Sequence, residues 1–231
     1  MSTLPPLSHP PSPISVVPQA IFFDLDGTLV DTAPDLGGAA NHIRHSLSLP
    51  PLPLADYRPH ASAGARGLLG KALGLTPDHA DFPRHRDAFL AHYAGHLADH
   101  SGLFDGFVET FAGFAARGIR WGVMTNKPSR YTEALMRALK LDSAACAIVS
   151  ADEVAKAKPS PDGLHLACQR AGVDAAQCWY VGDDKRDIDA GRAAGMVTVA
   201  AGWGYEGEHP LASWNADHVC ATPMDLLKLL P

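Results

Sequence analysis

The stretch from Ala20 to Asp31, which reads A-I-F-F-D-L-D-G-T-L-V-D, most strongly constrains how this chain folds. Its first four residues, Ala20 to Phe23, are apolar and run directly into two carboxylates, Asp24 and Asp26. A short apolar run that ends in turn residues is typical of a buried parallel strand. Because residues two apart on a strand point to the same side, we expect both carboxylates in one small space at the carboxyl end of this strand.

Two carboxylates in one space repel each other, so the site needs a cation or a shared proton. Mg²⁺ suits it, because this ion prefers oxygen ligands and leaves room for a phosphate. Gly27 allows a sharp turn and close approach of a ligand, and Thr28 adds a hydroxyl. The arrangement favours phosphoryl transfer, in which one Asp attacks phosphorus and the other handles the proton of the leaving group. The alternative is an acidic loop that only caps the next helix.

The part of the chain from residue 35 to residue 100 contains no convincing strand. Its pattern predicts three helices, at Asp35–Leu47, Ala63–Leu73 and Asp78–Leu97. They are separated by the proline-rich Leu49–Leu54 and by a break at Pro77. A helical block inserted directly after the first strand indicates a small all-helical cap above the carboxyl end of that strand.

From Leu103 onward, helical and strand patterns alternate, which predicts an α/β fold with a doubly wound parallel sheet, a Rossmann-like core. The expected helices are Gly106–Ala116, Arg130–Leu139, Asp162–Ala171 and Asp187–Ala194, and the expected strands are Ile119–Met124, Cys146–Val149, Cys178–Val181 and Val197–Ala200. We therefore expect a proline-rich tail at residues 1–18, a core formed by residues 19–34 and 101–231, and a cap at residues 35–100.

Two later strand ends carry polar groups suited to phosphate. Thr125 and Asn126 follow one strand and offer a hydroxyl and an amide, although the same residues also make a good turn. Lys158 lies in the proline-stiffened loop A-K-P-S-P, where it would place a positive charge opposite Asp24. A single lysine in a loop is otherwise a solvated side chain.

The strand end at V-G-D-D-K-R-D gives the strongest of these later signals. Carboxylates that gather at a strand terminus are costly unless a metal neutralises them. Asp183 is the best candidate for a metal ligand, and Asp187, one helical turn later, is the best partner behind it. Asp184 is well suited to cap the following helix.

With these four signals in this order, the chain resembles the haloacid dehalogenase-like hydrolases from Ala20 to about Leu230. The matching motifs are F-D-L-D-G-T-L-V-D-T, V-M-T-N-K, A-K-P-S-P and V-G-D-D-K-R-D-I-D-A-G. The resemblance implies that Asp24 is the nucleophile and Asp26 the acid and base, and that Thr125 and Lys158 bind phosphate. It also implies that Asp183 holds Mg²⁺ together with Asp24 and the backbone carbonyl of Asp26.

The helical insert resembles the cap of the phosphoglycolate phosphatase-like branch, so the resemblance implies a phosphatase that forms an aspartyl-phosphate. A dehalogenase of this fold has no use for Asp26 or a metal. A phosphomutase shares the first half-reaction, so the core motifs leave it open. A receiver-like phospho-acceptor switch would need only about half the length, and a catalytically dead binding protein would not need the full motif set.

The substrate implied by this branch is a small phosphorylated metabolite, first 2-phosphoglycolate. N-acetylmuramic acid 6-phosphate and other sugar phosphates are the alternative. Arg66, in the glycine-flanked segment S-A-G-A-R-G of the cap, is suited to a substrate carboxylate, or else is a solvated arginine. His92, His96 and His100 recur every four residues, which suggests either a zinc site or, more simply, a solvated helix face.

The composition narrows the class of partner. A formal net charge of −6 gives no support to nucleic-acid binding, and no apolar run approaches the roughly 20 residues of a membrane span. The tail has neither an apolar core nor an early basic cluster, so we do not expect a signal peptide. Four widely spaced cysteines indicate reduced thiols and the cytoplasm. The oligomeric state, monomer or homodimer, is left open.

Overall fold

The central element of the structure is strand β1 (Ala20–Phe23), whose four side chains are fully buried. The computed structural model describes residues 16–205 and 210–231, so most of the expected tail lies outside the described residues. Six parallel strands form one sheet in the order β5-β4-β1-β6-β7-β8. The other strands are β4 (Arg120–Thr125), β5 (Ile148–Ser150), β6 (Cys178–Gly182), β7 (Val197–Ala201) and β8 (His218–Cys220).

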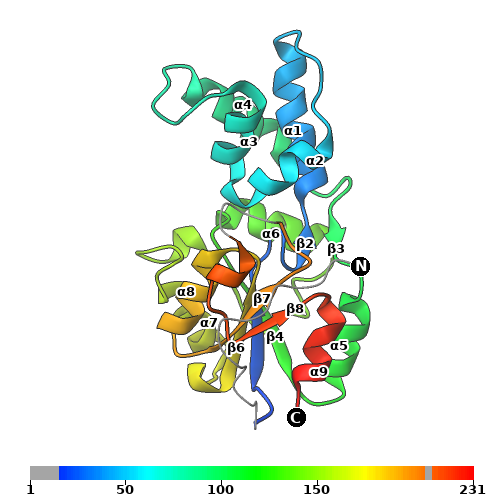
Figure 1. Cartoon of the computed structure of the whole chain (residues 1–231), viewed down its shortest axis with the longest axis vertical. Coiled ribbons are helices and arrows are strands. Elements are labelled where there is room, and N and C mark those ends of the chain that lie inside the picture. The colour runs from blue at the N-terminus through cyan, green and yellow to red at the C-terminus, as the bar shows by residue number, and fades with distance from the viewer. Residues whose placement is uncertain (1–15, 206–209) are drawn as a thin grey trace.

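Helices cover both faces of this sheet (Figure 1). Ile21 and Phe23 of β1 belong to a core shared with α5 (Phe107–Ala115), α6 (Ser129–Ala138) and α9 (Leu226–Leu229). Ala20 and Phe22 belong to a second core, shared with α7 (Asp162–Ala171) and α8 (Lys185–Ala193). Alternate residues of one strand thus fill opposite layers, which confirms the doubly wound, Rossmann-like core.

The helical insert lies beyond the carboxyl ends of the strands, at the upper end of Figure 1. It consists of α1 (Ala33–Ser46), α2 (Leu54–Tyr57), a 3₁₀ segment (Arg58–Ala63), α3 (Gly64–Leu73) and α4 (Phe82–Gly95). This confirms the expected all-helical cap. Neither α2 nor the 3₁₀ segment was predicted, because the prolines of this stretch were interpreted as helix breaks. Pro53 is in fact the N-cap residue of α2, and Pro59 is the second residue of the 3₁₀ segment, where a missing N–H costs nothing.

A two-stranded antiparallel sheet joins the cap to the core. Its strands, β2 (Val30–Asp31) and β3 (Gly102–Leu103), have two residues each, too few for any periodic signal in the sequence. Nearby, the buried carboxylate of Asp35 accepts hydrogen bonds from His100 N at 3.0 Å and from Ser101 Oγ at 2.6 Å. One side chain thus ties the two ends of the insert together. The division at residues 34/35 and 100/101 stays a prediction.

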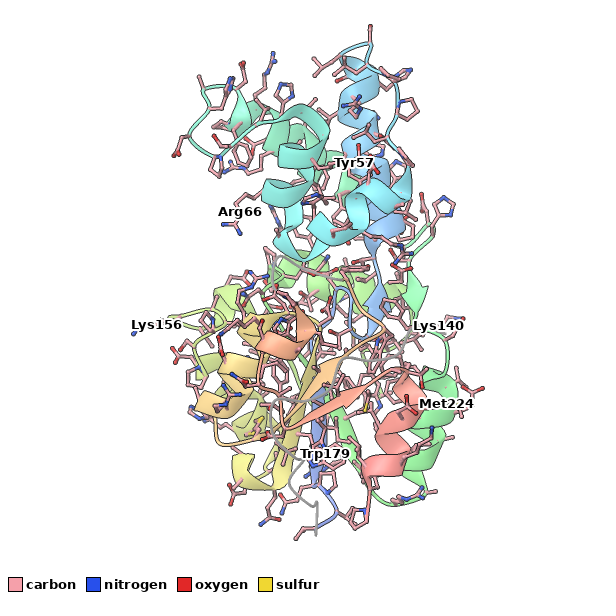
Figure 2. The ribbon with its side chains drawn as sticks, in the orientation of Figure 1. Tyr57, Arg66, Lys140, Lys156, Trp179 and Met224 are labelled. Carbon is pink, nitrogen blue, oxygen red and sulfur yellow. The ribbon has the colours of Figure 1, made fainter. Side chains whose placement is uncertain are left out.

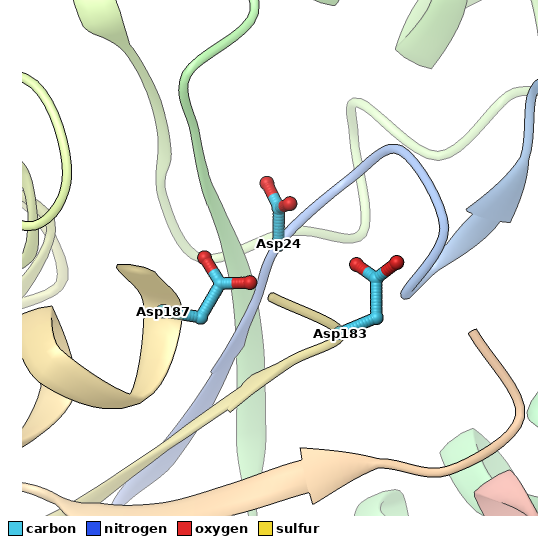
Figure 3. Close-up of side chains that lie close together, drawn as sticks. All are labelled: Asp24, Asp183 and Asp187. Carbon is cyan, nitrogen blue, oxygen red and sulfur yellow. The ribbon is translucent and has the colours of Figure 1, made fainter. Parts of the chain in front are cut away.

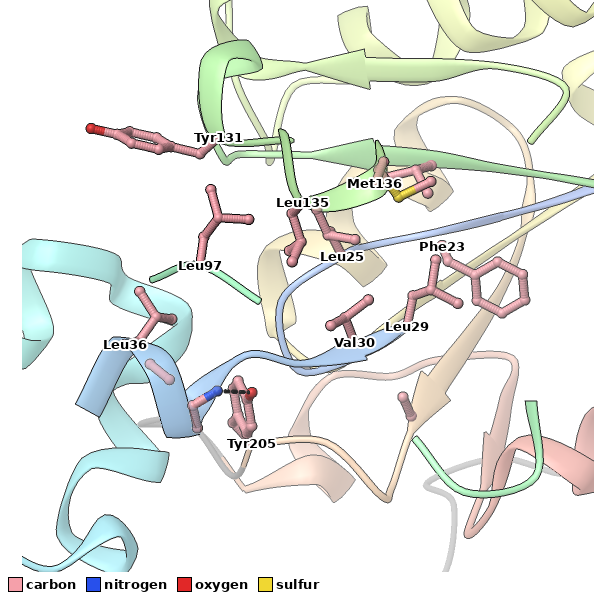
Figure 4. Packing of buried hydrophobic residues seen from close by; sticks show 14 of the residues in the cluster. Phe23, Leu25, Leu29, Val30, Leu36, Leu97, Tyr131, Leu135, Met136 and Tyr205 are labelled. Carbon is pink, nitrogen blue, oxygen red and sulfur yellow. Dashed lines mark hydrogen bonds between the residues drawn. The ribbon is translucent and has the colours of Figure 1, made fainter. Parts of the chain in front are cut away.

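Apolar packing continues from the core into the base of the cap (Figure 4). Leu36 of α1 and Leu97 after α4 belong to the same cluster as Tyr131 and Leu135 of α6. On another side, the hydroxyl of Tyr205 accepts a hydrogen bond from Ala33 N at 2.7 Å, at the start of α1. The cap therefore rests on the core through both apolar and polar contacts, directly above the carboxyl ends of the strands.

Candidate active site

Three carboxylates meet at the carboxyl ends of β1 and β6 (Figure 3). Asp24 follows β1, Asp183 follows β6, and Asp187 lies in the first turn of α8. Because Phe23 pairs with Val181, the two neighbouring strands bring Asp24 and Asp183 to one place. Oxygens of the three carboxylates lie within 4.8 Å of one another, at exposed fractions of 8, 1 and 1 %. Like charges buried this closely need a cation.

The turn at Gly27 shapes this cluster. Gly27 has a φ of +86°, and a Cβ there would lie 2.3 Å from Oδ2 of Asp183. Any other residue would be strained and would displace that carboxylate. The sharp turn expected from the sequence is present. Glycine is required there both by the positive φ and by the close approach of Asp183, which is far away along the chain. The direct role of Gly27 in substrate binding stays a prediction.

Lys158 supplies one positive charge to the cluster. Its Nζ lies 2.8 Å from Oδ1 of Asp24 and 2.6 Å from Oδ1 of Asp187, and it donates a hydrogen bond to the Tyr180 hydroxyl at 3.0 Å. Asn126 holds the loop in place, because its amide donates to Lys158 O at 3.2 Å and accepts from Lys158 N at 2.9 Å. The side-chain amide of Asn126, which was expected to bind phosphate, is thus hydrogen-bonded to the backbone of Lys158. Tyr180 was not predicted as a site residue, because it lies within an apolar strand pattern.

Burial sets the protonation of this cluster. It raises the pKa of Asp183 well above its ordinary value, and the charges of Asp24 and Asp187 add to the effect. Burial also raises the pKa of Asp187 to about 7, although Lys158 opposes the shift. For Lys158, burial alone would lower the pKa, but Asp187 and Asp24 reverse the direction and raise it. One ammonium therefore does not neutralise the three carboxylates fully.

Asp26 belongs to a second group of hydrogen-bonded residues, of which Lys127 lines the same pocket. Its Oδ1 accepts hydrogen bonds from Thr32 Oγ1 at 2.6 Å and from Lys127 Nζ at 2.9 Å. Lys127 also donates to the hydroxyl of Tyr93 at 2.9 Å, and Tyr93 belongs to α4 of the cap. Burial would lower the pKa of Lys127, but Asp26 and Tyr93 raise it. From the sequence, Lys127 was noted only as the neighbour of Asn126. Its contacts with Asp26 and with Tyr93 of the cap depend on tertiary structure.

Further contacts fix the orientation of Asp183. Its Oδ1 accepts a hydrogen bond from Thr28 Oγ1 at 2.8 Å, and its Oδ2 accepts one from Tyr205 N at 2.9 Å. The hydroxyl of Ser62, in the cap, donates to Oδ2 at 3.4 Å. Asp184 caps α8, accepting from Arg186 N at 2.8 Å, as its residue type suggested. With Asp184 as its N-cap residue, α8 starts at Lys185, two residues before the expected start.

Most of the candidate residues line one pocket of about 220 Å³ between core and cap. The pocket residues from the sequence analysis are Asp24, Asp26, Thr125, Asn126, Lys158, Asp184 and Asp187. Asp183 lies directly beneath it, beside Asp24. Arg66 is not among the residues that line this pocket; it is exposed and lies on a neighbouring groove. The structure therefore brings the core motifs together and leaves the cap arginine outside this pocket.

The cap histidines do not form a metal site in the described part of the chain. The rings of His42 and His92 stack with centroids 3.9 Å apart, and those of His92 and His96 stack at 4.4 Å. The acidic triad is the group among the described residues whose ligand atoms converge closely enough for an ion. This geometry favours the simpler interpretation of the histidines as a helix face.

The donor set of the triad fits Mg²⁺, which takes oxygen ligands. Oδ1 of Asp24 is buried and lies 2.8 Å from Nζ of Lys158, an ammonium that it shares with Asp187. One shared positive charge leaves the three carboxylates with an excess of negative charge that an ion can neutralise. Asp183 is held rigidly by Thr28 and Tyr205, as a metal ligand requires.

This chemistry predicts that added Mg²⁺ stabilises the protein more as the pH rises. Carboxyl groups with a raised pKa contribute stability below the unfolded value near 4, and that contribution is lost as the pH rises through the folded value, about 7 for Asp187. We expect the gain in Tm on adding Mg²⁺ to grow by roughly 5 °C or more between pH 5 and pH 7.5. Thermal unfolding with EDTA and with Mg²⁺ measures it.

The Asp187→Asn variant is the control, since it removes one of the two titrating groups and should flatten the dependence. A gain that stays constant or shrinks as the pH rises would contradict the prediction. Taking the difference between the two conditions cancels the titration of distant histidines.

The chain is similar over most of its length to known proteins of one family. The family model described as haloacid dehalogenase-like hydrolase matches residues 18–195. The chain is 38 % identical over 213 residues to an N-acetylmuramic acid 6-phosphate phosphatase of Pseudomonas aeruginosa, covering 92 % of this chain and 94 % of the relative. It is 40 % identical to a phosphoglycolate phosphatase of Xanthomonas campestris pv. campestris, with 90 % and 95 % covered.

A crystal structure described as a predicted phosphoglycolate phosphatase from Haemophilus somnus matches the fold, with a TM-score of 0.80, 28 % identity and 93 % and 99 % of the two chains covered. These matches extend over the cap as well as the core. The chain belongs to the haloacid dehalogenase-like hydrolase family.

Proposed function

We propose that this protein is a Mg²⁺-dependent phosphomonoesterase that acts on a small phosphorylated metabolite through an aspartyl-phosphate. The observation that carries the proposal is the position of Asp24, between Lys158 and Asp183 and in one pocket with Asp26. A carboxylate so placed is a nucleophile with a positive charge and a metal site beside it.

In the first half-reaction, a carboxylate oxygen of Asp24 attacks phosphorus and the ester oxygen leaves. Asp26 gives that oxygen its proton. Lys158 and Thr125 hold the phosphate oxygens and spread their charge. In the second half-reaction, Asp26 takes a proton from water, the water oxygen attacks phosphorus, and Asp24 is released with inorganic phosphate.

Mg²⁺ would be held by the carboxylates of Asp24 and Asp183 and by the backbone carbonyl of Asp26, where it supplies further positive charge to the phosphate. Asp187 lies close to this site but forms an ion pair with Lys158, which suits a role in holding the lysine. Asp184, as the cap of α8, keeps the start of that helix in place.

The substrate is proposed from relatives and from space. The name of the Xanthomonas relative favours 2-phosphoglycolate, and the catalytic pocket of about 220 Å³ suits so small an ester. The name of the Pseudomonas relative favours N-acetylmuramic acid 6-phosphate, a larger ester. A specific observation supports this second candidate, because the catalytic pocket adjoins a second cavity of about 840 Å³.

Release of inorganic phosphate tests the proposal directly. Purified protein should hydrolyse p-nitrophenyl phosphate with Mg²⁺ and lose that activity in EDTA. A panel of phosphorylated acids and sugar phosphates then ranks substrates by kcat/KM. Absence of phosphate release from every ester would contradict the proposal. A lasting phosphoprotein without turnover would favour a receiver-like switch, and transfer of phosphate to a second sugar hydroxyl would favour a phosphomutase.

The proposed compartment of this protein is the cytoplasm, on the basis of its cysteines. All four cysteines are free thiols, and three are buried, which suits a reducing compartment such as the cytoplasm. Within the described residues, no helix has both the length and the apolar character needed to cross a membrane. The net charge of −6 gives no support to nucleic-acid binding.

A further inference from the structure

A groove of about 840 Å³ adjoins the catalytic pocket. Residues of the cap, in the 3₁₀ segment and α3, form one wall, and the start of α8 forms the other. Ser62, Ala63, Asp184 and Arg186 line both cavities, so the groove is the outward continuation of the pocket. A volume of this size is typical of sites for ligands larger than a two-carbon acid.

The charge of the groove is opposite to that of the whole chain. Four basic and two acidic side chains line it, whereas the chain carries a formal net charge of −6. The basic side chains are Arg66, Lys71, Lys185 and Arg186, and the acidic ones are Asp184 and Asp189. A local excess of positive charge between concave walls attracts an anion.

Within the part of the chain that the structure describes, Arg66 is the cation of this set whose side chain has no partner. Lys71 lies 3.3 Å from Asp56, Lys185 lies 2.5 Å from Asp189 and Arg186 lies 2.8 Å from Asp184. The guanidinium of Arg66 forms no ion pair or hydrogen bond with any other described residue. Figure 2 shows its side chain leaving the cap on the side of the molecule where α8 lies. Its guanidinium is therefore available to a ligand in the groove.

Arg186 marks the boundary between the two cavities. Its Nη2 donates a hydrogen bond to Ser62 O at 3.2 Å, across the gap between core and cap. Ser62 in turn contacts Asp183 at 3.4 Å, so this boundary lies directly beside the acidic triad. A substrate with its phosphate at Asp24 and a long leaving group would pass this point and enter the groove.

The position of Arg66 bears on the class of substrate. In 2-phosphoglycolate the carboxylate is joined to the carbon of the ester bond, so with phosphorus at Asp24 it stays within the catalytic pocket. Arg66 lines only the outer groove. A carboxylate can reach it only when several bonds of leaving group lie between the acid and the phosphate.

We propose that the groove is a second subsite, which binds the anionic far end of a sugar-sized phosphate monoester, with Arg66 as the partner of a carboxylate. This inference rests on the proposed function, since it assumes that the phosphate lies at Asp24. It assigns Arg66 to specificity for a long acidic substrate and not to 2-phosphoglycolate.

A matched pair of sugars tests the subsite. N-acetylmuramic acid 6-phosphate and N-acetylglucosamine 6-phosphate differ by the lactyl ether and its carboxylate, so their ratio of kcat/KM isolates that group. We expect Arg66→Gln to lower this ratio by roughly ten- to a hundredfold, the loss of one charge-assisted hydrogen bond, and Arg66→Lys to restore part of it. Arg86→Gln, which removes an exposed cap arginine outside the groove, should leave the ratio unchanged.

Binding separates this inference from the proposed function. In the Asp24→Asn background, calorimetry with the same two sugars measures the Kd ratio without turnover, and Arg66→Gln should change it similarly. An unchanged ratio would overturn the subsite while phosphate release still supported the phosphatase. Equal losses on the two sugars, or a comparable loss on 2-phosphoglycolate, would also overturn it. Binding that responds to Arg66 without hydrolysis would instead contradict the proposed function alone.

Discussion

Asp24→Asn is expected to abolish phosphate release, with a loss on the order of 10⁴-fold or more in kcat, and to leave the fold intact. The amide cannot attack phosphorus, and no other carboxylate takes its position, because Asp187 is paired to Lys158 and Asp183 to Thr28. The substitution also removes one of three mutually repelling buried carboxylates. We therefore expect an unchanged or raised Tm.

Steady-state kinetics with p-nitrophenyl phosphate and thermal unfolding of the same preparation check both parts. Asp142→Asn, which alters an exposed aspartate outside both the pocket and the neighbouring groove, is the matched control and should retain activity. Turnover near the wild-type rate by folded Asp24→Asn protein would refute the covalent mechanism. Trapping of a phosphoaspartate elsewhere would identify another nucleophile.

Lys158→Met is expected to lose both stability and activity. The ammonium lies between Asp24 and Asp187 at 2.8 and 2.6 Å and is 6 % exposed, so its removal leaves buried carboxylates without their cation. Breaking a buried pair in this way costs roughly 3–5 kcal/mol, which lowers Tm by roughly 6–20 °C in a chain of this size. We expect kcat/KM to fall by about 10²- to 10³-fold, as on loss of one preorganised partner of the phosphate.

The loss of stability should grow as the pH rises. Lys158 lowers the pKa of Asp187, so the variant holds a proton there at higher pH and must lose it on unfolding. Lys156→Met, an exposed lysine two residues earlier in the same loop, is the control, and its position is labelled in Figure 2. Similar effects of the two substitutions would show that the loop, and not the ammonium of Lys158, is responsible.

The sequence alone predicted the parts of the site that depend on order along the chain. Each core motif follows an apolar strand pattern, and carboxyl ends of parallel strands share one edge of the sheet. That rule was enough to bring Asp24 and Asp183 together before their distances were known. Lys158 lies in a loop well beyond the end of β5, and the resemblance to the family was needed to place it at the phosphate. It also predicted Asp184 as the cap of α8, because capping is a local property.

Contacts between distant segments escaped the sequence analysis. Tyr180 looks like an ordinary core residue of a buried strand, yet its hydroxyl accepts from Lys158. Lys127 looks like a turn lysine, yet it joins Asp26 to Tyr93 of the cap. Tyr205 lies at 22 residues from Asp183 along the chain and still donates its backbone N–H to it. No periodic pattern records such pairings.

The cap shows most clearly which features local patterns predict and which depend on contacts between distant segments. Its helices follow from the apolar spacing of residues 35 to 100, and an inserted block after the first strand has to lie over the edge where that strand ends. The same spacing does not predict which cavity Arg66 faces. The tilt of the cap on the core decides this, and that tilt is set by the packing of Leu36, Leu97 and Tyr131 and by contacts such as the hydrogen bond from Arg186 to Ser62. Local patterns therefore determined the fold class and the candidate residues of the site, whereas side-chain packing between core and cap decided which cavity each cap residue lines.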